Sequence, residues 1–288
     1  MGQQLQAKGM HVAILDVEPA ALEVGLASLR ASAPEGSRVE GYICDVSSLA
    51  QVEEAAAGVA QDFAGSPIGF VCANAGVAGG GILTATEADW DWVLGVNVKG
   101  VAWMMRTFVP LMQAQSYPSV FCTTASILGL VPMSSGVYGA SKAAAVAMCE
   151  LLQKELSIAG DDHVSVHCLC PPIAQTNILA SGRNRPEELT DNSKAAALTQ
   201  EEAAAAELAG RQMGAFYAAH GEKPETVVAA MIDNVEKGMF FTILDNVEGY
   251  EYNIREQIAR RMGGQISEQG ALGPGAHTLR GPASQEQN

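Results

Sequence analysis

The sequence contains few basic residues and no long apolar run. Its 17 lysines and arginines are outnumbered by 32 aspartates and glutamates, which leaves a formal net charge of −15 at pH 7. This charge repels phosphate backbones and anionic lipids, so we expect no nucleic-acid partner. No run of about 18 apolar residues occurs, and the start MGQQLQAKG does not resemble a signal peptide. We therefore expect no membrane span and a cytoplasmic location.

Cysteine is scarce, and its 6 copies lie inside apolar stretches such as GYICD and FVCAN. Reduced thiols behave there as small hydrophobic residues, which favours a reducing compartment. Cys168 and Cys170 are separated by one residue and have no second Cys/His pair nearby. We therefore expect them to pack in the core, and we expect no metal site.

Short β-branched runs alternate with longer alanine- and leucine-rich segments of helical period. This alternation is typical of βαβ units around a parallel sheet. We expect strands at residues 10–17, 39–45, 68–74, 119–126, 163–170 and 239–245. We expect helices at residues 19–31, 48–64, 87–114 and 138–159. Because the strands are apolar almost throughout, the pattern predicts an α/β, Rossmann-like doubly wound sheet with helices on both faces.

The chain reads as a single domain over residues 1–262. Residues 171–223 form a long polar and then alanine-rich insertion before the last strand, which predicts a mobile lid over a site. Residues 263–288 are rich in Gly, Pro, Ser and Gln, so we expect a disordered tail.

Tyr138 and Lys142 lie four residues apart in VYGASKAA, at the predicted start of a helix. This spacing puts both side chains on one face, where a cation favours the phenolate form of the tyrosine. The alternative is a pair of polar residues on the solvent side of the helix. Ser126 closes the strand predicted at 119–126, at the edge where open α/β sheets bind ligands. A loop cap is the structural alternative for Ser126.

Further candidates follow the other predicted strands. The segment ANAG, residues 73–76, ends one strand, and Asp45 with Val46 ends another. Small residues at such positions let a flat ligand approach the backbone closely. Asn97 lies within an apolar helical segment and needs a hydrogen-bond partner, either in a functional site or as a satisfied asparagine that bends the helix.

These residues together resemble the short-chain dehydrogenase/reductase family over about residues 5 to 262. The resemblance is carried by Asn74-Ala75-Gly76, Asn97, Ser126, Tyr138 and Lys142, in this order. It implies that Tyr138 is a general acid/base for an alcohol or carbonyl oxygen and that Ser126 polarises the same oxygen. It also implies that Lys142 lowers the pKa of the tyrosine and binds the nicotinamide ribose.

The same resemblance assigns further residues. Asn97 would hold a water in a proton relay, and Asn74, Ala75 and Gly76 would line the cofactor site. Cofactor contacts are implied for Asp45 and Val46 at the adenine and for Ile173 and Thr176 at the nicotinamide half.

Asp16 ends the first predicted strand. A carboxylate there accepts from a ribose 2′-hydroxyl and repels a 2′-phosphate, which favours NAD over NADP. A helix cap before Pro19 is the alternative for Asp16.

The sequence departs from the family pattern in its cofactor loop. No G-x-G-x-x-G occurs, and LQAKGMHV reads as the end of the helix that should follow such a loop. We expect an N-terminally truncated sheet, the alternative being that strands 10–17 and 68–74 close on each other. In addition, Ser126 is about one residue nearer Tyr138 than is usual in the family, and Pro172 stands where the family prefers glycine.

The sequence therefore predicts an NAD(P)-dependent oxidoreductase that interconverts a small apolar secondary alcohol and its ketone. A catalytically inactive relative that acts as an interaction protein is the alternative. A hydrolase is a third and weaker reading, because GASKA lacks the last glycine of G-x-S-x-G. The helix at 138–159 is apolar around most of its circumference, which predicts a homodimer or homotetramer.

Overall fold

The structure is a computed structural model. It describes residues 1–131, 136–190, 199–244, 246–247, 250–251, 254, 256 and 258–259. The tail expected to be disordered, 263–288, lies outside the described residues.

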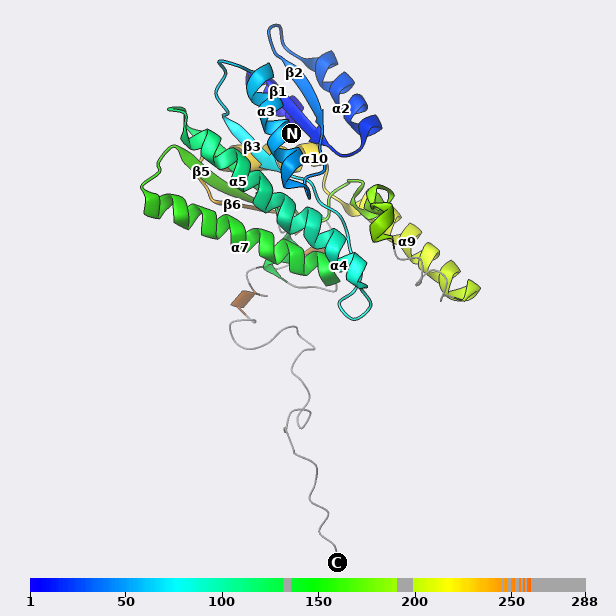
Figure 1. Cartoon of the computed structure of the whole chain (residues 1–288). Coiled ribbons are helices and arrows are strands. Elements are labelled where there is room, and N and C mark those ends of the chain that lie inside the picture. The colour runs from blue at the N-terminus through cyan, green and yellow to red at the C-terminus, as the bar shows by residue number, and fades with distance from the viewer. Residues whose placement is uncertain are drawn as a thin grey trace, which may run out of the picture.

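Strands and helices alternate along the chain (Figure 1). The strands are β1 (Val12–Asp16), β2 (Val39–Ile43), β3 (Phe70–Ala73), β4 (Ser119–Thr124), β5 (Val164–Cys170), β6 (Phe241–Ile243), β7 (Asn246–Val247) and β8 (Tyr250–Glu251). The α-helices are α1 (Gly2–Gln6), α2 (Pro19–Ser32), α3 (Leu49–Asp62), α4 (Glu87–Leu94), α5 (Gly100–Gln113), α6 (Ile127–Leu130), α7 (Gly136–Ala159), α9 (Gln200–His220) and α10 (Pro224–Glu236). The described residues also include a π-helical turn η1 (Gly95–Lys99) and two 3₁₀ turns, η2 (Ile178–Asn184) and η3 (Glu187–Leu189).

The six predicted strands are present as β1 to β6, each shorter than predicted. The prediction that Ser126 closes a strand is wrong, because β4 ends at Thr124 and Ser126 is the N-cap residue of α6. The single helix predicted at 87–114 is also wrong. The turn η1 interrupts it, since Asn97 in that turn hydrogen-bonds the segment after β3 instead of following a regular helical face.

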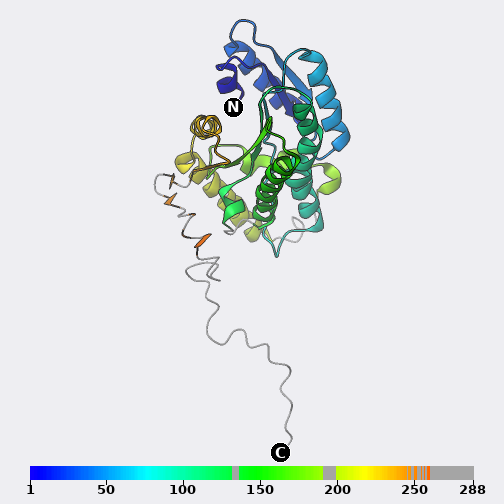
Figure 2. The ribbon, with the colours of Figure 1, turned by 90° about the vertical axis from the view of Figure 1, so that its left-hand side faces the viewer.

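Strands β1 to β6 form parallel sheets covered by helices on both sides, which confirms a Rossmann-like α/β fold. Helices α3, α5 and α7 lie on one side, with α1 and α10 on the other (Figure 2). Strands β3, β4, β5 and β6 pair in that order, with Phe70 opposite Val120 and Cys168 opposite Phe241. Strands β1 and β2 pair separately, with Val12 opposite Val39.

The parallel sheet is split between β1 and β3. Within the described residues, the strand partner of β1 is β2 and that of β3 is β4. The alternative expectation, that these two edges close on each other, is wrong. Helices on one side bridge the two parts, because α3 contacts both β2 and α5, and α5 contacts β3.

The main core lies between β3, β4 and β5 and the helices α3, α5 and α7. Its buried residues include Val52, Phe108, Phe121 and Val166. All six cysteines are free, and the Sγ atoms of Cys168 and Cys170 lie 3.8 Å apart inside the core. Both thiols therefore act as packing residues.

The described part of the chain offers neither a membrane span nor a metal cluster. No helix there is long and apolar enough to cross a membrane. No group of three or more His, Cys, Asp or Glu side chains in those residues is arranged to hold a metal ion.

Candidate active site

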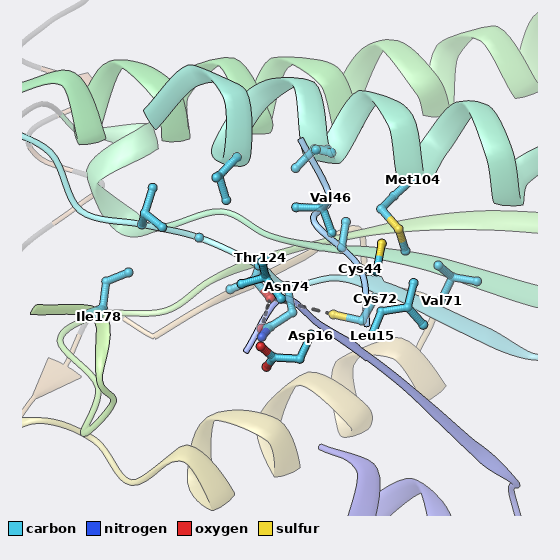
Figure 3. A pocket seen from close by; sticks show the side chains of 18 of the residues that line it. Leu15, Asp16, Cys44, Val46, Val71, Cys72, Asn74, Met104, Thr124 and Ile178 are labelled. Atoms are coloured by element: carbon cyan, nitrogen blue, oxygen red, sulfur yellow. Dashed lines mark hydrogen bonds between the residues drawn. The ribbon is translucent and has the colours of Figure 1, made fainter. Parts of the chain in front are cut away.

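A cavity of about 1950 Å³ runs along the split in the sheet and reaches the carboxyl ends of the strands. Figure 3 shows Asp16, Asn74 and Thr124 at this end, with apolar side chains such as Val71 and Met104 farther in. The lining includes residues after β1, β2, β3, β4 and β5. Nearly all of the candidate residues predicted from the sequence therefore meet in one space.

Tyr138 and Ser126 are twelve positions apart in the sequence, and both line this cavity. Ser126 precedes α6, where its Oγ accepts from Leu128 N at 3.1 Å, so the cap role is present. Its side chain also hydrogen-bonds Tyr138. Burial raises the pKa of Tyr138 to about 12, although the hydrogen bond with Ser126 lowers it. This direction is opposite to the lowering by Lys142 that the resemblance implied, because removal from water outweighs the other effects.

Lys142 lies one helical turn after Tyr138 and is only 3% exposed. Its Nζ donates to Thr124 O at 2.7 Å and lies 5.7 Å from the centre of the Tyr138 ring. Burial lowers the pKa of Lys142 to about 8, partly offset by nearby thiols. A Cβ atom on Gly76 would lie 3.2 Å from this Nζ, so glycine at 76 leaves the lysine its space. The pair is not a feature of a solvent-exposed helix face.

Asn97 is fully buried and joins three parts of the site. Its Oδ1 accepts from Val77 N at 2.8 Å, and its Nδ2 donates to Val77 O at 2.9 Å and to Ser141 Oγ at 2.9 Å. The side chain thus ties the segment after β3 to the helix that carries Tyr138. Asn97 also lies in a π-helical turn, a feature that is frequent at functional sites. Its amide is hydrogen-bonded, and its role in a proton relay stays a prediction.

The other end of the cavity carries two carboxylates. Asp16 ends β1 and its Oδ1 accepts from Glu18 N at 2.9 Å, while Glu18, not Asp16, is the N-cap position of α2. Asp45 follows β2 and its Oδ1 accepts from Ser47 N at 2.9 Å. Val46 lines the same wall. Each of these hydrogen bonds uses the Oδ1 atom, and both residues line the cavity.

Between the two ends lie Asn74, Ala75 and Gly76, all in the cavity wall, with Asn74 and Ala75 exposed. Asn74 Oδ1 accepts from Thr124 Oγ1 at 2.9 Å. Ile173 and Thr176 line the wall from the segment after β5. Thr124 was missed from the sequence, although it ends a strand whose neighbours end in the same cavity.

A lid was predicted at residues 171–223. The structure describes residues 171–190 and 199–223 of this segment, which contain η2, η3 and α9. Ser181 Oγ accepts from Ala78 N at 3.0 Å, across the cavity. Arg185 Nη1 lies 2.6 Å from Asp89 Oδ1 on α4, and the guanidinium stacks 5.2 Å from the Trp92 ring centre. Sequence reasoning missed these anchors, since nothing in the pattern pairs residues about a hundred positions apart.

Comparisons with known proteins agree on a family. The family model of the short chain dehydrogenases matches residues 1–187. A CLA biosynthesis dehydrogenase/reductase of Lactiplantibacillus plantarum is 27% identical over 256 residues, 88% of this chain and 85% of that protein. A C alpha-dehydrogenase of a Sphingobium strain is 29% identical over 237 residues, 82% of this chain and 72% of that protein.

A solved structure has the same fold. It is a short-chain dehydrogenase/reductase from Burkholderia phymatum in complex with NAD, 33% identical, with a TM-score of 0.73 over 83% of this chain and 82% of the other. The family model covers more than half of the sequence, and the tyrosine, serine and lysine meet in one cavity. The chain therefore belongs to the short-chain dehydrogenase family, a family of oxidoreductases.

Proposed function

We propose that the protein is an NAD-dependent oxidoreductase that interconverts a secondary alcohol and a ketone, with Tyr138 as the general acid/base. The observation that carries this proposal is the contact between Tyr138 and Ser126 beside the buried Lys142, in a cavity that reaches Asp16. Hydroxyl donors that converge on one point fit a carbonyl oxygen that gains negative charge.

The residues of this cavity fit a dinucleotide at both ends. Asp16 offers a carboxylate to an adenosine ribose, and Lys142 offers an ammonium to the ribose near Tyr138. Glycine at 76 leaves room beside Lys142, because a Cβ atom there would lie 3.2 Å from the lysine Nζ. A bound nicotinamide would supply hydride exchange with the substrate carbon. The relative from Burkholderia phymatum, solved with NAD, supports the choice of cofactor class.

In this proposal the chain's own residues hold the oxygen and move its proton. With a pKa of about 12, the Tyr138 phenol is protonated at neutral pH and is ready to donate to a ketone oxygen. Ser126 donates to the same oxygen and holds it in place. Lys142 then stabilises the phenolate left behind, since its cation lies 5.7 Å from the ring centre. Leu128, Ile173 and Phe216 line this end, which favours an apolar substrate.

The test of the acid/base is Tyr138→Phe, which keeps the ring and removes the hydroxyl. We expect turnover of a panel of apolar secondary alcohols to fall by about 10²-fold or more. Tyr117→Phe is the matched control, because Tyr117 lines the other end of the same cavity and should leave turnover unchanged. Steady-state rates from NADH absorbance give the readout. Retained turnover in the Tyr138 variant would exclude the role.

The preference for NAD rests on Asp16. Replacing Asp16 by alanine removes the charge that repels a 2′-phosphate, so we expect the ratio of kcat/KM for NADP to that for NAD to rise about tenfold or more. Glu40→Ala, a removed carboxylate on β2 that does not line the cavity, should leave the ratio unchanged. An unchanged ratio in the Asp16 variant would contradict this assignment.

A non-catalytic interaction protein is the second candidate. The split between β1 and β3 and the lack of a G-x-G-x-x-G motif favour it, since pyrophosphate binding normally uses the backbone donors of such a loop. Calorimetric titration of the chain with NADH separates the two. Micromolar binding supports the enzyme, and no binding up to millimolar NADH supports the interaction protein.

A further inference from the structure

Helix α9 turns one of its faces toward the cavity. The cavity-lining residues of this helix follow the i, i+3, i+4, i+7, i+8 spacing of a single helical face. They are Ala209, Gln212, Met213, Phe216 and Tyr217. Among these five, Gln212 and Tyr217 carry side-chain hydrogen-bonding groups, and they are separated by about 7.5 Å along the helix axis.

The carboxyl end of α9 is fixed to the segment that follows β5. Gln175 N donates to Glu222 O at 2.9 Å, and Glu222 N donates to Ile173 O at 2.9 Å. Gly221 allows this close approach, since a Cβ atom there would lie 2.5 Å from Tyr217 O. Tyr217 therefore lies next to an anchored junction, whereas the other lining residues of α9 are farther from it.

This junction is connected to the helix that Ser126 caps. Ile173 packs against the buried cluster that contains Ile127, the first residue of α6, and Ser126 is the N-cap of that helix. Burial is the main cause of the raised pKa of Tyr138, and the neighbouring phenol of Tyr217 raises it further. Such an effect requires the two phenols to be close together. Tyr217 thus lies at the end of the cavity where Tyr138 and Ser126 meet.

The phenol of Tyr217 is not used by the fold. Within the part of the chain that the structure describes, no group hydrogen-bonds its oxygen, and burial raises its pKa. The neighbouring wall, formed by Leu128, Ile173 and Phe216, is apolar. A partly buried hydroxyl among apolar groups gains free energy when a ligand supplies the missing hydrogen bond.

We propose that Tyr217 is a specificity-determining residue whose phenol binds a second oxygen atom of the substrate. This inference rests on the proposed function, because it takes the reacting oxygen to lie at Tyr138 and Ser126. Since the two phenols lie at the same end of the cavity, the second oxygen belongs on a carbon next to the reacting one. The substrate class is then a hydroxy ketone, or the corresponding vicinal diol, with an apolar remainder. A plain hydrocarbon ketone would leave the phenol without a partner.

The test compares 2-heptanone with 3-hydroxy-2-heptanone, which differ by one hydroxyl. The whole chain carries ¹³C-labelled tyrosine, and the NMR signal that disappears in Tyr217→Phe belongs to Tyr217. Titrations are done with NAD present, so that neither ketone is reduced. We expect the hydroxy ketone to shift this signal and to bind at least about tenfold more tightly than 2-heptanone. In Tyr217→Phe the ratio of the two dissociation constants should fall to about one.

Tyr117→Phe is the matched control, because it removes a phenol from the other end of the same cavity and should leave the ratio unchanged. A ratio of one in the unaltered protein would overturn the proposal. So would a ratio that Tyr217→Phe leaves unchanged, or the absence of binding by both ketones.

The result is separable from the test of the proposed function. Tyr138→Phe should lose turnover and keep the preference for the hydroxy ketone, because both ketones lose the same contact at the reacting oxygen. Retained turnover in Tyr138→Phe would refute the acid/base role, whereas the ratio of dissociation constants would still report on Tyr217.

Discussion

Lys142 is the residue at which burial and charge conflict most directly. Its ammonium is removed from water and has Thr124 O as its hydrogen-bond acceptor. Burial therefore lowers its pKa from 10.5 to about 8, which means that the folded state disfavours the charged form. The folded protein carries this cost fully below about pH 8, and the cost disappears as the pH rises from about 8 to about 10.5.

We accordingly expect Lys142→Met to be more favourable to stability at pH 7 than at pH 10. Relative to the unaltered protein, the free energy of unfolding of the variant should fall by about 3 kcal/mol between these two pH values. Tyr138 and the buried thiols titrate in both proteins, so the difference isolates the lysine. Urea denaturation at both pH values measures it. Lys154→Met, on the same helix, is the control, and a pH-independent difference would contradict the assignment.

At the scale of elements, the segment that was predicted to be a lid, here called the lid segment, is held by a partly buried ion pair between Arg185 and Asp89. The two side chains are 17% and 15% exposed, and Arg185 Nε also donates to Leu189 O at 2.7 Å. Such a charge-assisted contact in low dielectric is stronger than a surface pair. It fixes η2 and η3 over the cavity, while Ser181 bonds the segment after β3.

Removal of this anchor should loosen the lid segment without touching the reacting groups. For Arg185→Ala we expect about a tenfold higher KM for the alcohol, with a much smaller change in kcat, and faster amide exchange over residues 178–189. Arg183→Ala is the control, because the Arg183–Glu18 pair is more exposed and should contribute less. An equal change of kcat and KM in both variants would argue against an anchoring role.

At the scale of the whole molecule, the side of α7 away from the sheet leaves large apolar side chains in solvent. Leu151 is 61% exposed and Ile158 is 76% exposed. A second chain that covered this face would bury them, which gives the expected homodimer or homotetramer a location. The covered apolar area would favour association.

We predict that the protein scatters light as a dimer or tetramer at micromolar concentration. The double substitution Leu151→Lys with Ile158→Lys should shift it to a monomer, because two buried charges in an interface are costly. Val24→Lys is the matched control, since Val24 is equally apolar and 72% exposed on the distant α2. A monomeric unaltered protein would exclude the prediction.

The local pattern of the sequence determined the α/β class, the order and approximate positions of β1 to β6, and the grouping of the tyrosine, serine and lysine at one sheet edge. Apolar strands and helical periods depend on neighbouring residues, so they can be read without the fold. Three features could not be predicted in this way: the interruption of the helix at Asn97, the end of β4 before Ser126 and the direction of the Tyr138 pKa shift. Each depends on which groups the folded chain brings close together.

Only the tertiary structure decided that the two edges of the split stay apart. The sequence left open whether β1 and β3 would meet, since strand pairing is a long-range contact that local pattern does not specify. Helices on one side bridge the split, and the Gln115 side chain hydrogen-bonds the backbone of Ile68 from 47 residues away. The Arg185–Asp89 ion pair of the lid segment could not be predicted for the same reason, because its two residues are far apart in the sequence. Packing between distant segments, not local preference, sets these features.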